Sequence, residues 1–414
     1  MTARSSTPSR LRVGAALGGF EAEGGYNGAG QPANNWCWWE VEGRTPHRRA
    51  AGGFWEYWEA HVAGAAAAGC RAARVSIEWA RCEPLDGRPD DQAIADYCRV
   101  LDACHESGLQ PVVTLHRFAH PAWMGVDFWL RPDSPERFRQ WVELAVDRFA
   151  GRTHQWVTVD QLNACAVWPY LAGRHPPGRR LDVAATIRSL DHLLAAHVLA
   201  YEAIKERQPQ AHVATGNRSL PVYELDRLLV DVLLARRAGV GRHDLRPWLE
   251  ERRSEHHGAA EPSAGALTWV LRHWAQSAIP LAQALARAVA AVYDSPCDRP
   301  IDTLVVAGDG GDVRSVLPAR LAGPHRPRRG QAFPLRPLDV LPELPVSVVN
   351  DVPAGMDRLR ADLDRVTAAA AGGLPVSSYF CRMTGLGTPE AVAGYRDVLS
   401  HVVEGNGTPP VRST

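Results

Sequence analysis

The architecture of this 414-residue chain is easiest to infer from Pro111-Val-Val-Thr-Leu-His-Arg-Phe-Ala-His-Pro121. Its first half is an apolar run as long as a buried strand, and its second half is polar and ends in proline, as a loop does. Similar apolar runs recur and alternate with longer amphipathic segments, which is typical of βα units around a parallel sheet. The pattern predicts strands at Val13–Gly18, Ala73–Ile77, Gln110–Leu115, Trp156–Val159, His212–Gly216, Thr303–Val306, Val346–Val349 and Val376–Phe380.

Helix-period segments lie between these strands, and a glycine follows the end of several of them, where a left-handed residue ends a helix. The helices predicted in this way are Phe54–Ala68, Asp91–Ser107, Pro135–Phe149, Val183–Gln208, Gly355–Ala371 and Pro389–Val402. The fold class is therefore α/β, and the architecture we expect is a single-domain (β/α)8 TIM barrel.

The expected domain limits follow from the outermost strand and helix. The barrel spans residues 13–404, between a flexible N-terminus at 1–12 and a flexible, proline-containing tail at 405–414. Residues 223–291 break the alternation, because they are rich in helix-period segments and contain no clear strand. We interpret them as a helix-rich elaboration that follows the fifth strand.

The overall charge gives no reason to expect a nucleic-acid or membrane partner. Forty-six basic residues balance 46 acidic ones, and every basic residue except Lys205 is arginine, as in proteins from G+C-rich bacteria. The eight cysteines form no CxxC pair, and the N-terminus lacks an apolar signal core. These features predict a bacterial, cytoplasmic protein with free thiols, no cofactor and a small-molecule ligand or substrate. The oligomeric state is left open.

The order of the motifs resembles glycoside hydrolase family 1, the β-glucosidase family. Arg74-Val-Ser-Ile-Glu-Trp-Ala-Arg81 is similar to the family's Arg-Phe-Ser-Ile-Ser-Trp-Ser-Arg, and Pro111–Pro121 is similar to its Pro-Val-Val-Thr-Leu-Tyr-His-Trp-Asp-Leu-Pro. Gly14–Gly24 resembles the family's first strand, and Tyr170–Gly178 resembles the segment after its acid/base residue. The resemblance is strong over residues 13–220 and weaker over 300–402, and it implies a TIM barrel.

The resemblance also implies that both catalytic glutamates are replaced. Thr158-Val-Asp-Gln-Leu-Asn163 stands where the family has Thr-Phe-Asn-Glu-Pro-Asn, and Val348-Val-Asn-Asp351 stands where it has Ile-Thr-Glu-Asn. Gln161 and Asn350 would then occupy the acid/base and nucleophile positions. An amide can act neither as the acid/base group nor as the nucleophile, because retaining hydrolysis requires two carboxyl groups about 5–5.5 Å apart. On this reading the chain is a pseudoglycosidase with a repurposed active site.

Most positions that would grip a sugar ring differ as well. Glu21 replaces the family's glutamine on the first strand, Arg117 its histidine on the third, and Asp160 the asparagine before the acid/base residue. Arg382 stands at the position of the tryptophan after the eighth strand. Arg74, Trp79 and Asn163 match the family and have a structural interpretation beside the functional one.

The acids that remain near the expected strand ends form the candidate catalytic set, Asp160, Glu21 and Glu78. Carboxylates crowded in a dry pocket raise one another's pKa, which suits proton transfer near neutral pH. The alternative is a set of internal ion pairs, for example between Arg117 and Asp160 or Glu21. A metal site of His116, Glu78 and Asp160 lacks a compact ligand spacing, so no metal is expected.

The candidate substrate-binding residues are Gln161, Asn350, Arg117, His116, Trp36, Trp79, Asn163, Asn217 and Arg382. Trp36 belongs to a tryptophan cluster in the loop after the first strand, where an aromatic ring could stack on a ligand or simply pack under the loop. Cys165 has two interpretations, a nucleophile or a core residue, and free cysteines are usually core.

Three functions remain open on this sequence. The first is acid/base catalysis of a non-hydrolytic reaction, such as a cyclase, isomerase or lyase reaction in the biosynthesis of a specialised metabolite, with Asp160 as the most consequential acid. The second is a non-catalytic pseudoglycosidase that binds a ligand or a partner protein. The third is sugar chemistry assisted by the substrate itself.

Overall fold

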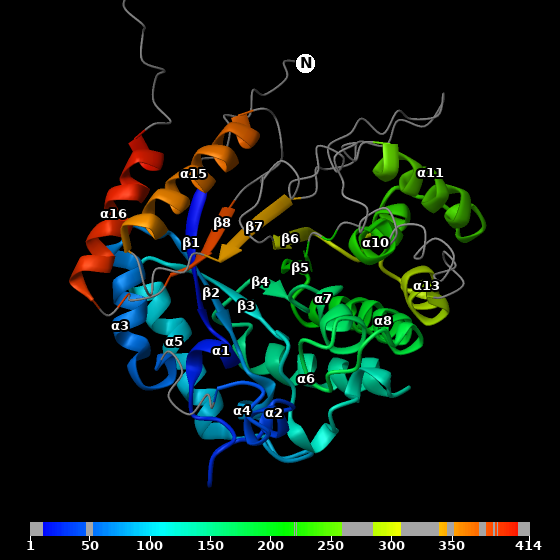
Figure 1. Cartoon of the computed structure of the whole chain (residues 1–414), viewed down its shortest axis with the longest axis horizontal. Coiled ribbons are helices and arrows are strands. Elements are labelled where there is room, and N and C mark those ends of the chain that lie inside the picture. The colour runs from blue at the N-terminus through cyan, green and yellow to red at the C-terminus, as the bar shows by residue number, and fades with distance from the viewer. Residues whose placement is uncertain are drawn as a thin grey trace, which may run out of the picture.

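Eight parallel strands close into a barrel in the computed structural model of the chain (Figure 1). The structure describes residues 11–46, 53–218, 220, 222–258, 285–307, 339–345, 352–371, 378–383, 386 and 388–404. The strands follow one another around the barrel in chain order, and β1 also pairs with β8. They are β1 (Arg12–Gly18), β2 (Ala72–Ser76), β3 (Gln110–Thr114), β4 (Gln155–Val157), β5 (His212–Arg218), β6 (Thr303–Ala307), β7 (Asp339–Pro345) and β8 (Ser378–Arg382).

The TIM barrel predicted from the alternation of apolar runs is confirmed, and seven of the eight strands overlap the expected segments. The seventh strand was placed wrongly, because it lies at Asp339–Pro345 and ends before Val346–Val349 begins. Its place is set by pairing with both neighbours, since Thr303 of β6 lies opposite Asp339 and Phe380 of β8 lies opposite Glu343. Residues 346–350, including Asn350, lie outside the described part of the chain.

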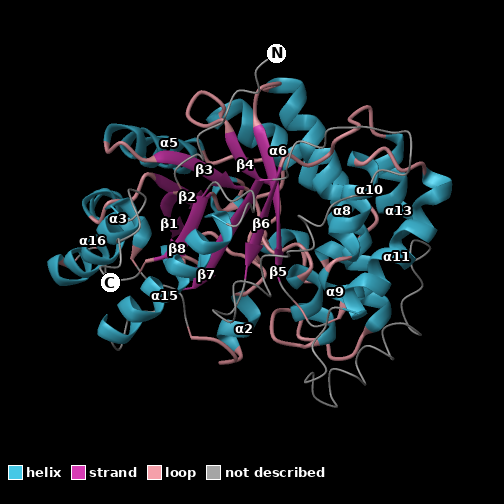
Figure 2. Cartoon of the chain, turned by 90° about the horizontal axis from the view of Figure 1, so that it is seen from above, coloured by secondary structure: helices cyan, strands magenta, loops and turns pink. Residues whose placement is uncertain are grey.

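Helices surround the barrel on its outer side (Figure 2). All six predicted helices are present, with ends that differ by at most a few residues. The α-helices are α1 (Phe20–Glu23), α2 (Cys37–Val41), α3 (Phe54–Ala67), α4 (Trp79–Cys82), α5 (Asp91–Glu106), α6 (Ser134–Phe149), α7 (Ala164–Ala166), α8 (Val183–Arg207), α9 (Tyr223–Asp226), α10 (Leu228–Arg237), α11 (Leu245–Gly258), α13 (Ala286–Asp294), α15 (Val352–Ala371) and α16 (Pro389–Glu404).

Four shorter turns complete the described elements. Three are 3-10 turns, at Ala122–Met124, Phe128–Leu130 and Arg242–Asp244. The fourth is a π-helical turn at Val167–Leu171. Such turns insert one extra residue per turn and often lie at functional sites. Here the π-helical turn follows the end of β4 and carries Trp168.

Helix α5 shows how sequence and packing agree in these βα units. Asp90 caps its N-terminus, because the carboxylate accepts hydrogen bonds from the backbone nitrogens of Gln92 and Ala93, each 3.0 Å long. Ile94, Tyr97 and further apolar residues with helical spacing are buried against the sheet.

The barrel interior is a small apolar cluster contributed by six strands, and it is separate from the larger core between sheet and helices. Its members are Ala72, Val112, Val157, Ala214, Val305 and Phe380. Gly14 of β1 makes room for the Phe380 ring, since a side chain at position 14 would overlap that ring. Side chains therefore fill this part of the barrel interior, as in other barrels of this class, whose ligands bind at the carboxyl ends of the strands.

The helix-rich elaboration is confirmed for the described part of residues 223–291. Helices α9, α10 and α11 follow one another between Tyr223 and Gly258, and α13 begins at Ala286. Within the described residues, α10 and α11 lie together with α13 on one side of the barrel (Figure 1). No helix in the described ranges is both long and apolar enough to cross a bilayer.

Candidate functional site

The residues predicted to carry the chemistry lie just after the carboxyl ends of neighbouring strands. Glu21 is on α1 after β1, and Arg117 follows β3. Asp160 and Gln161 follow β4, and Arg218 ends β5. In a TIM barrel these ends meet at one face, where enzymes of this fold bind their substrates.

Asp160 forms the charged centre of this face. Its Oδ2 lies 2.8 Å from Nη1 of Arg117, and its Oδ1 lies 3.3 Å from Nη1 of Arg74. The Asp160 side chain is completely buried, as is nearly all of Arg74. Both carboxylate oxygens therefore serve as counter-ions to guanidinium groups, which is the internal ion pairing that the sequence left open.

Gln161 is held by a neighbouring arginine. Its Oε1 accepts a hydrogen bond of 3.1 Å from Nη1 of Arg218, and the side chain is buried. The Gln161 backbone is left-handed, with φ of 50°, and Phe118 after β3 is similar, with φ of 59°. Such backbones cost about 1–2 kcal/mol for a non-glycine residue, and they gather at binding and catalytic sites.

Glu21 is the predicted acid that reaches solvent. Its side chain is 36% exposed, and its Oε2 lies 3.9 Å from Nη2 of Arg117. Arg117 thus stands between a buried carboxylate, Asp160, and an exposed one, Glu21. The structure brings these three residues together as predicted from the sequence.

Glu78 belongs to a different, sealed cluster. Its Oε1 accepts a hydrogen bond of 3.0 Å from the backbone nitrogen of Phe20, and the residue is buried. Burial, followed by the charge of nearby Glu23, raises the pKa of Glu78 well above its ordinary value. Glu23 in turn accepts hydrogen bonds from Tyr26 and Tyr97. Glu78 therefore resembles a neutral, internal carboxylic acid more than a group placed to meet a ligand.

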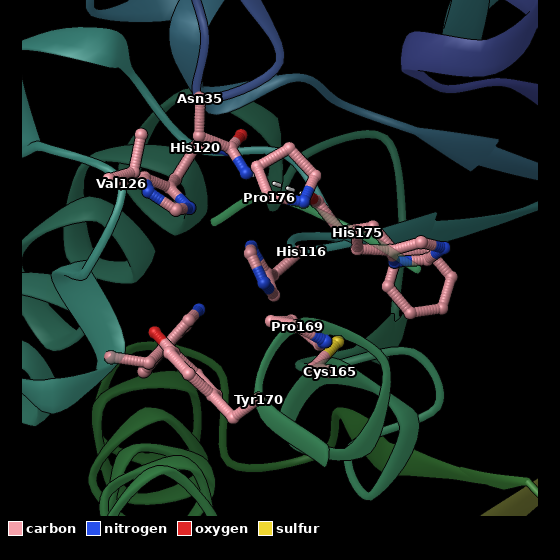
Figure 3. A pocket seen from close by; sticks show the side chains of 11 residues that line it. Asn35, His116, His120, Val126, Cys165, Pro169, Tyr170, His175 and Pro176 are labelled. Atoms are coloured by element: carbon pink, nitrogen blue, oxygen red, sulfur yellow. Dashed lines mark hydrogen bonds between the residues drawn. The ribbon is translucent and has the colours of Figure 1, made fainter. Parts of the chain in front are cut away.

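A small pocket opens beside this face, and Figure 3 shows the side chains that line it. The lining is Asn35, His116, Phe118, His120, Val126, Trp129, Cys165, Pro169, Tyr170, His175 and Pro176. The His116 ring stands between Asn35 and His120 on one side and Tyr170 on the other (Figure 3). About 20 Å³ of the pocket is open to a water molecule, which is room for one ordered water.

The pocket histidines are neutral at physiological pH. Burial, helped by the neighbouring His120, lowers the pKa of His116 to about 3, and burial lowers that of His120 to about 4. Burial also lowers the pKa of His175 to about 4. Cys165 is buried, and burial raises the pKa of its thiol, so it is a core residue here. Among the described residues no cluster of acids, histidines or cysteines could hold a metal ion.

The structure does not bring every predicted binding residue to this face. Trp79 stacks on Trp141 at 5.8 Å in the core. The Asn163 amide donates to the backbone oxygens of Arg218 and Leu225, and Asn217 donates to the backbone oxygen of Asp226. These two asparagines fasten the segment after β5.

Of the remaining predicted binding residues, the structure describes the position of one, Trp36. Trp36 lies between Phe20 and His175, with its Nε1 donating to the backbone oxygen of Phe118 at 3.0 Å. It therefore contacts two of the residues that line the pocket, Phe118 and His175. Asn350 and the side chain of Arg382 lie outside what the structure describes.

The sequence reasoning missed a pair of arginines on one tryptophan. The guanidinium carbons of Arg174 and Arg218 lie 5.3 Å and 5.6 Å from the ring centroid of Trp168. Burial first, then the charges of Arg117 and Arg174, lower the pKa of Arg218. A signal for Arg218 was present, because it lies two residues beyond the predicted end of strand five. The π-helical turn that places Trp168 has no signature in the sequence.

Comparisons with known proteins identify the family to which this barrel is similar. Residues 4–238 match the model of the family described as glycosyl hydrolase family 1. The chain is 28% identical over 235 residues to 6-phospho-beta-galactosidase 1 of Streptococcus pneumoniae, which covers 56% of this chain and 50% of that protein. It is 27% identical over 187 residues to Beta-glucosidase 5 of Oryza sativa subsp. japonica, covering 43% and 36%. The chain spans about half or less of the length of these relatives.

A solved structure extends the likeness of the fold to nearly the whole chain. The family 1 β-glucosidase from Thermotoga maritima superposes with a TM-score of 0.70 at 17% identity, covering 96% of this chain and 99% of that one.

Proposed function

The chain belongs to glycosyl hydrolase family 1, and we propose that within this family it binds a small molecule at the barrel mouth without hydrolysing glycosides. The observation that carries this proposal is the environment of Gln161. This residue follows β4, where the family resemblance expects the acid/base glutamate, and it accepts a hydrogen bond from Arg218. An amide in that place neither donates a proton to a leaving group nor accepts one from water.

No other described acid near Gln161 is placed to serve as the acid/base group expected at this position. Asp160 has both oxygens on arginines and no exposed surface. Glu78 is sealed behind Phe20. A retaining mechanism needs two carboxyl groups that both touch the glycosidic bond. Glu21 is then one acid without the partner that the mechanism requires, and Asn350 at the expected nucleophile position would supply none.

Restoring the glutamates tests whether the rest of the barrel mouth still suits glycoside hydrolysis. A glutamate at position 161 would lie against the Arg218 guanidinium, which favours the ionised form, whereas a general acid requires a raised pKa. The double variant Gln161→Glu, Asn350→Glu should therefore fold but fail to become an efficient glucosidase. A double variant that hydrolyses aryl glucosides with kcat above about 1 s⁻¹, the range of ordinary enzymes, would show that the rest of the barrel mouth still accepts a sugar. Hydrolysis at that rate by the wild-type chain would refute the proposal.

A second candidate function is acid/base catalysis of a non-hydrolytic reaction, such as cyclisation, isomerisation or elimination. The observation that favours it is Glu21, which is partly exposed beside Arg117 and so could exchange protons with a bound molecule. Once a converted molecule is found, Glu21→Gln should lower kcat by about 100-fold or more, the usual contribution of a general acid or base. Unchanged turnover by Glu21→Gln would show that Glu21 is not the group that transfers the proton.

The names of the relatives suggest the first molecules to test. The Streptococcus pneumoniae protein is named a 6-phospho-beta-galactosidase, and the rice protein is named a beta-glucosidase. Galactose 6-phosphate and glucose are therefore reasonable starting ligands, one charged and one neutral.

A further inference from the structure

The barrel mouth carries more positive than negative charge among the described residues. Arg117 and Arg218 flank the ends of β3 and β5, and Arg174 comes from the loop after the π-helical turn. The carboxylates facing them are Asp160, which Arg74 and Arg117 share, and the exposed Glu21. Four guanidinium groups, those of Arg74, Arg117, Arg174 and Arg218, therefore meet two carboxylates, or three when the buried Glu78 is counted as well.

The arginines are held in place before any ligand arrives. Arg117 is fixed by its 2.8 Å contact with Asp160. Arg218 is fixed by its hydrogen bond to Gln161 and by the face of Trp168. Arg174 lies against the same indole and is exposed. A guanidinium that is already oriented loses less conformational freedom when it binds a planar anion, which is why such groups suit carboxylate and phosphate recognition.

The arginines also influence one another and their surroundings electrostatically. Burial lowers the pKa of Arg218, Asp160 raises it, and the charges of Arg117 and Arg174 lower it further. Burial likewise lowers the pKa of His175, Glu21 raises it, and the charges of Arg218 and Arg174 lower it. Like charges repel, and a bound anion would offset the part of that repulsion which Asp160 and Glu21 leave.

We propose that Arg117, Arg174 and Arg218 form an anion subsite at the barrel mouth, and that the molecule bound there carries a carboxylate or phosphate group. This inference rests on the proposed function and names the class of ligand. Arg218 and Arg117 approach the anion from the strand ends, and Arg174 approaches it from the loop. Gln161 orients Arg218, which gives an amide a reason to stand at this position. Glu21 lies at the rim beside Arg117 and disfavours ligands with a second negative charge on that side.

Isothermal titration of the full chain tests the subsite with galactose 6-phosphate, inorganic phosphate and citrate, and with galactose as the neutral match. At least one of the three anions should bind, with a Kd at least about tenfold lower than that of galactose, because a hydrogen bond to a charged group contributes about that much. Comparing the Kd of phosphate with that of citrate shows whether the subsite prefers a phosphate or a carboxylate group. Raising the salt concentration from 50 to 500 mM should weaken the binding of the anion and leave galactose unchanged.

Variants assign the effect to the three arginines. Arg218→Gln should weaken anion binding about tenfold, Arg174→Gln somewhat less because it is exposed, and the double variant more than either. Arg188→Gln, the same change on the exposed side of α8, should bind as the wild type does. Circular dichroism of each variant shows whether it is folded.

Two results would overturn the inference. One is equal or tighter binding of galactose than of all three anions. The other is wild-type anion affinity in the folded Arg174→Gln, Arg218→Gln double variant. Either would leave the proposed function standing, since a neutral ligand could still bind without being cleaved. Hydrolysis of glycosides would instead refute the function and not the subsite.

Discussion

Asp160 shows how the sequence can place a single residue correctly and still leave its role open. Family resemblance predicted that it points into the barrel mouth, and the contact with Arg117 agrees with that direction. The sequence could not show that Arg74 reaches the other oxygen, because the two residues are 86 positions apart and meet only when β2 and β4 take their places in the barrel. A buried carboxylate between two guanidinium groups has a structural role whether or not it also serves chemistry.

The first residue-scale prediction concerns this ion pair. Asp160→Asn removes the charge and leaves Arg74 and Arg117 less compensated in a dry site, so the free energy of unfolding should fall by about 3 kcal/mol. Urea denaturation followed by circular dichroism measures it. Glu21→Gln is the matched control, because Glu21 is partly exposed and 3.9 Å from its arginine, and it should change stability by less than about 0.5 kcal/mol. Equal stability of the Asp160→Asn and wild-type proteins would contradict the structural role.

The second residue-scale prediction concerns the pH dependence of the free energy of unfolding that Glu78 causes. Its pKa is raised in the folded chain, so it keeps its proton there while the unfolded chain releases one above about pH 4.3. The stability it contributes is therefore fully present below the unfolded pKa and is lost as pH rises toward the folded pKa. Glu78→Gln keeps an oxygen for the backbone nitrogen of Phe20 and removes the titration.

The measured quantity is the difference in free energy of unfolding between Glu78→Gln and the wild type. As the pH rises above 5, the variant should become more stable relative to the wild type, by up to about 1.4 kcal/mol per pH unit. Glu106→Gln, an exposed position near the end of α5, should show no such trend. A difference that stays constant between pH 5 and pH 8 would show that Glu78 is ionised in the folded protein.

At the scale of elements, the site depends on how closely β5 approaches the end of β4. A side chain on Gly216 would lie 2.7 Å from Oδ1 of Asp160 and would also overlap the backbone nitrogen of Gln161. Only glycine lets the two strand ends approach so closely, and this approach sets the position of both predicted site residues.

Gly216→Ala should therefore lower the free energy of unfolding by about 1–3 kcal/mol and weaken the binding of any ligand that contacts Gln161. Denaturation and titration calorimetry measure the two effects. Gly151→Ala is the control, since its new methyl group would meet no atom within 4 Å, and it should be neutral or slightly stabilising. A fully stable Gly216→Ala protein with wild-type binding would show that β4 and β5 can separate without consequence.

The strands and helices themselves were largely predictable, and the exceptions have physical causes. Short apolar runs marked β1 to β6 because burial on both faces of a parallel strand leaves a continuous signal. The seventh strand was misplaced because Val346–Val349 is more apolar than the real strand, Asp339–Pro345, which contains two acids and two prolines. Register with β6 and β8, which no single sequence shows, decides between such segments.

For the whole molecule, the motifs predicted a family 1 barrel, and the family and the fold are both confirmed. The site was predictable only in part. Residues next to strand ends were found, because strand position fixes where they lie; Glu21, Arg117, Asp160 and Gln161 are such residues. Arg174, Trp168 and His175 were missed, because they come from a loop whose path depends on a π-helical turn and on contacts with Trp36 and Phe118.

The central claim is that a family 1 barrel of this sequence does not cleave β-glycosides. The most direct measurement is the release of 4-nitrophenol from its β-glucoside, β-galactoside and β-galactoside 6-phosphate by the purified wild-type chain, with Gln161→Ala measured alongside. Each 1.36 kcal/mol lost from transition-state stabilisation slows turnover about tenfold, and a missing catalytic carboxylate removes several kcal/mol. We expect release at the rate of the buffer alone, equal for both proteins. Release by the wild type at about 1 s⁻¹ or faster, lost in Gln161→Ala, would contradict the claim.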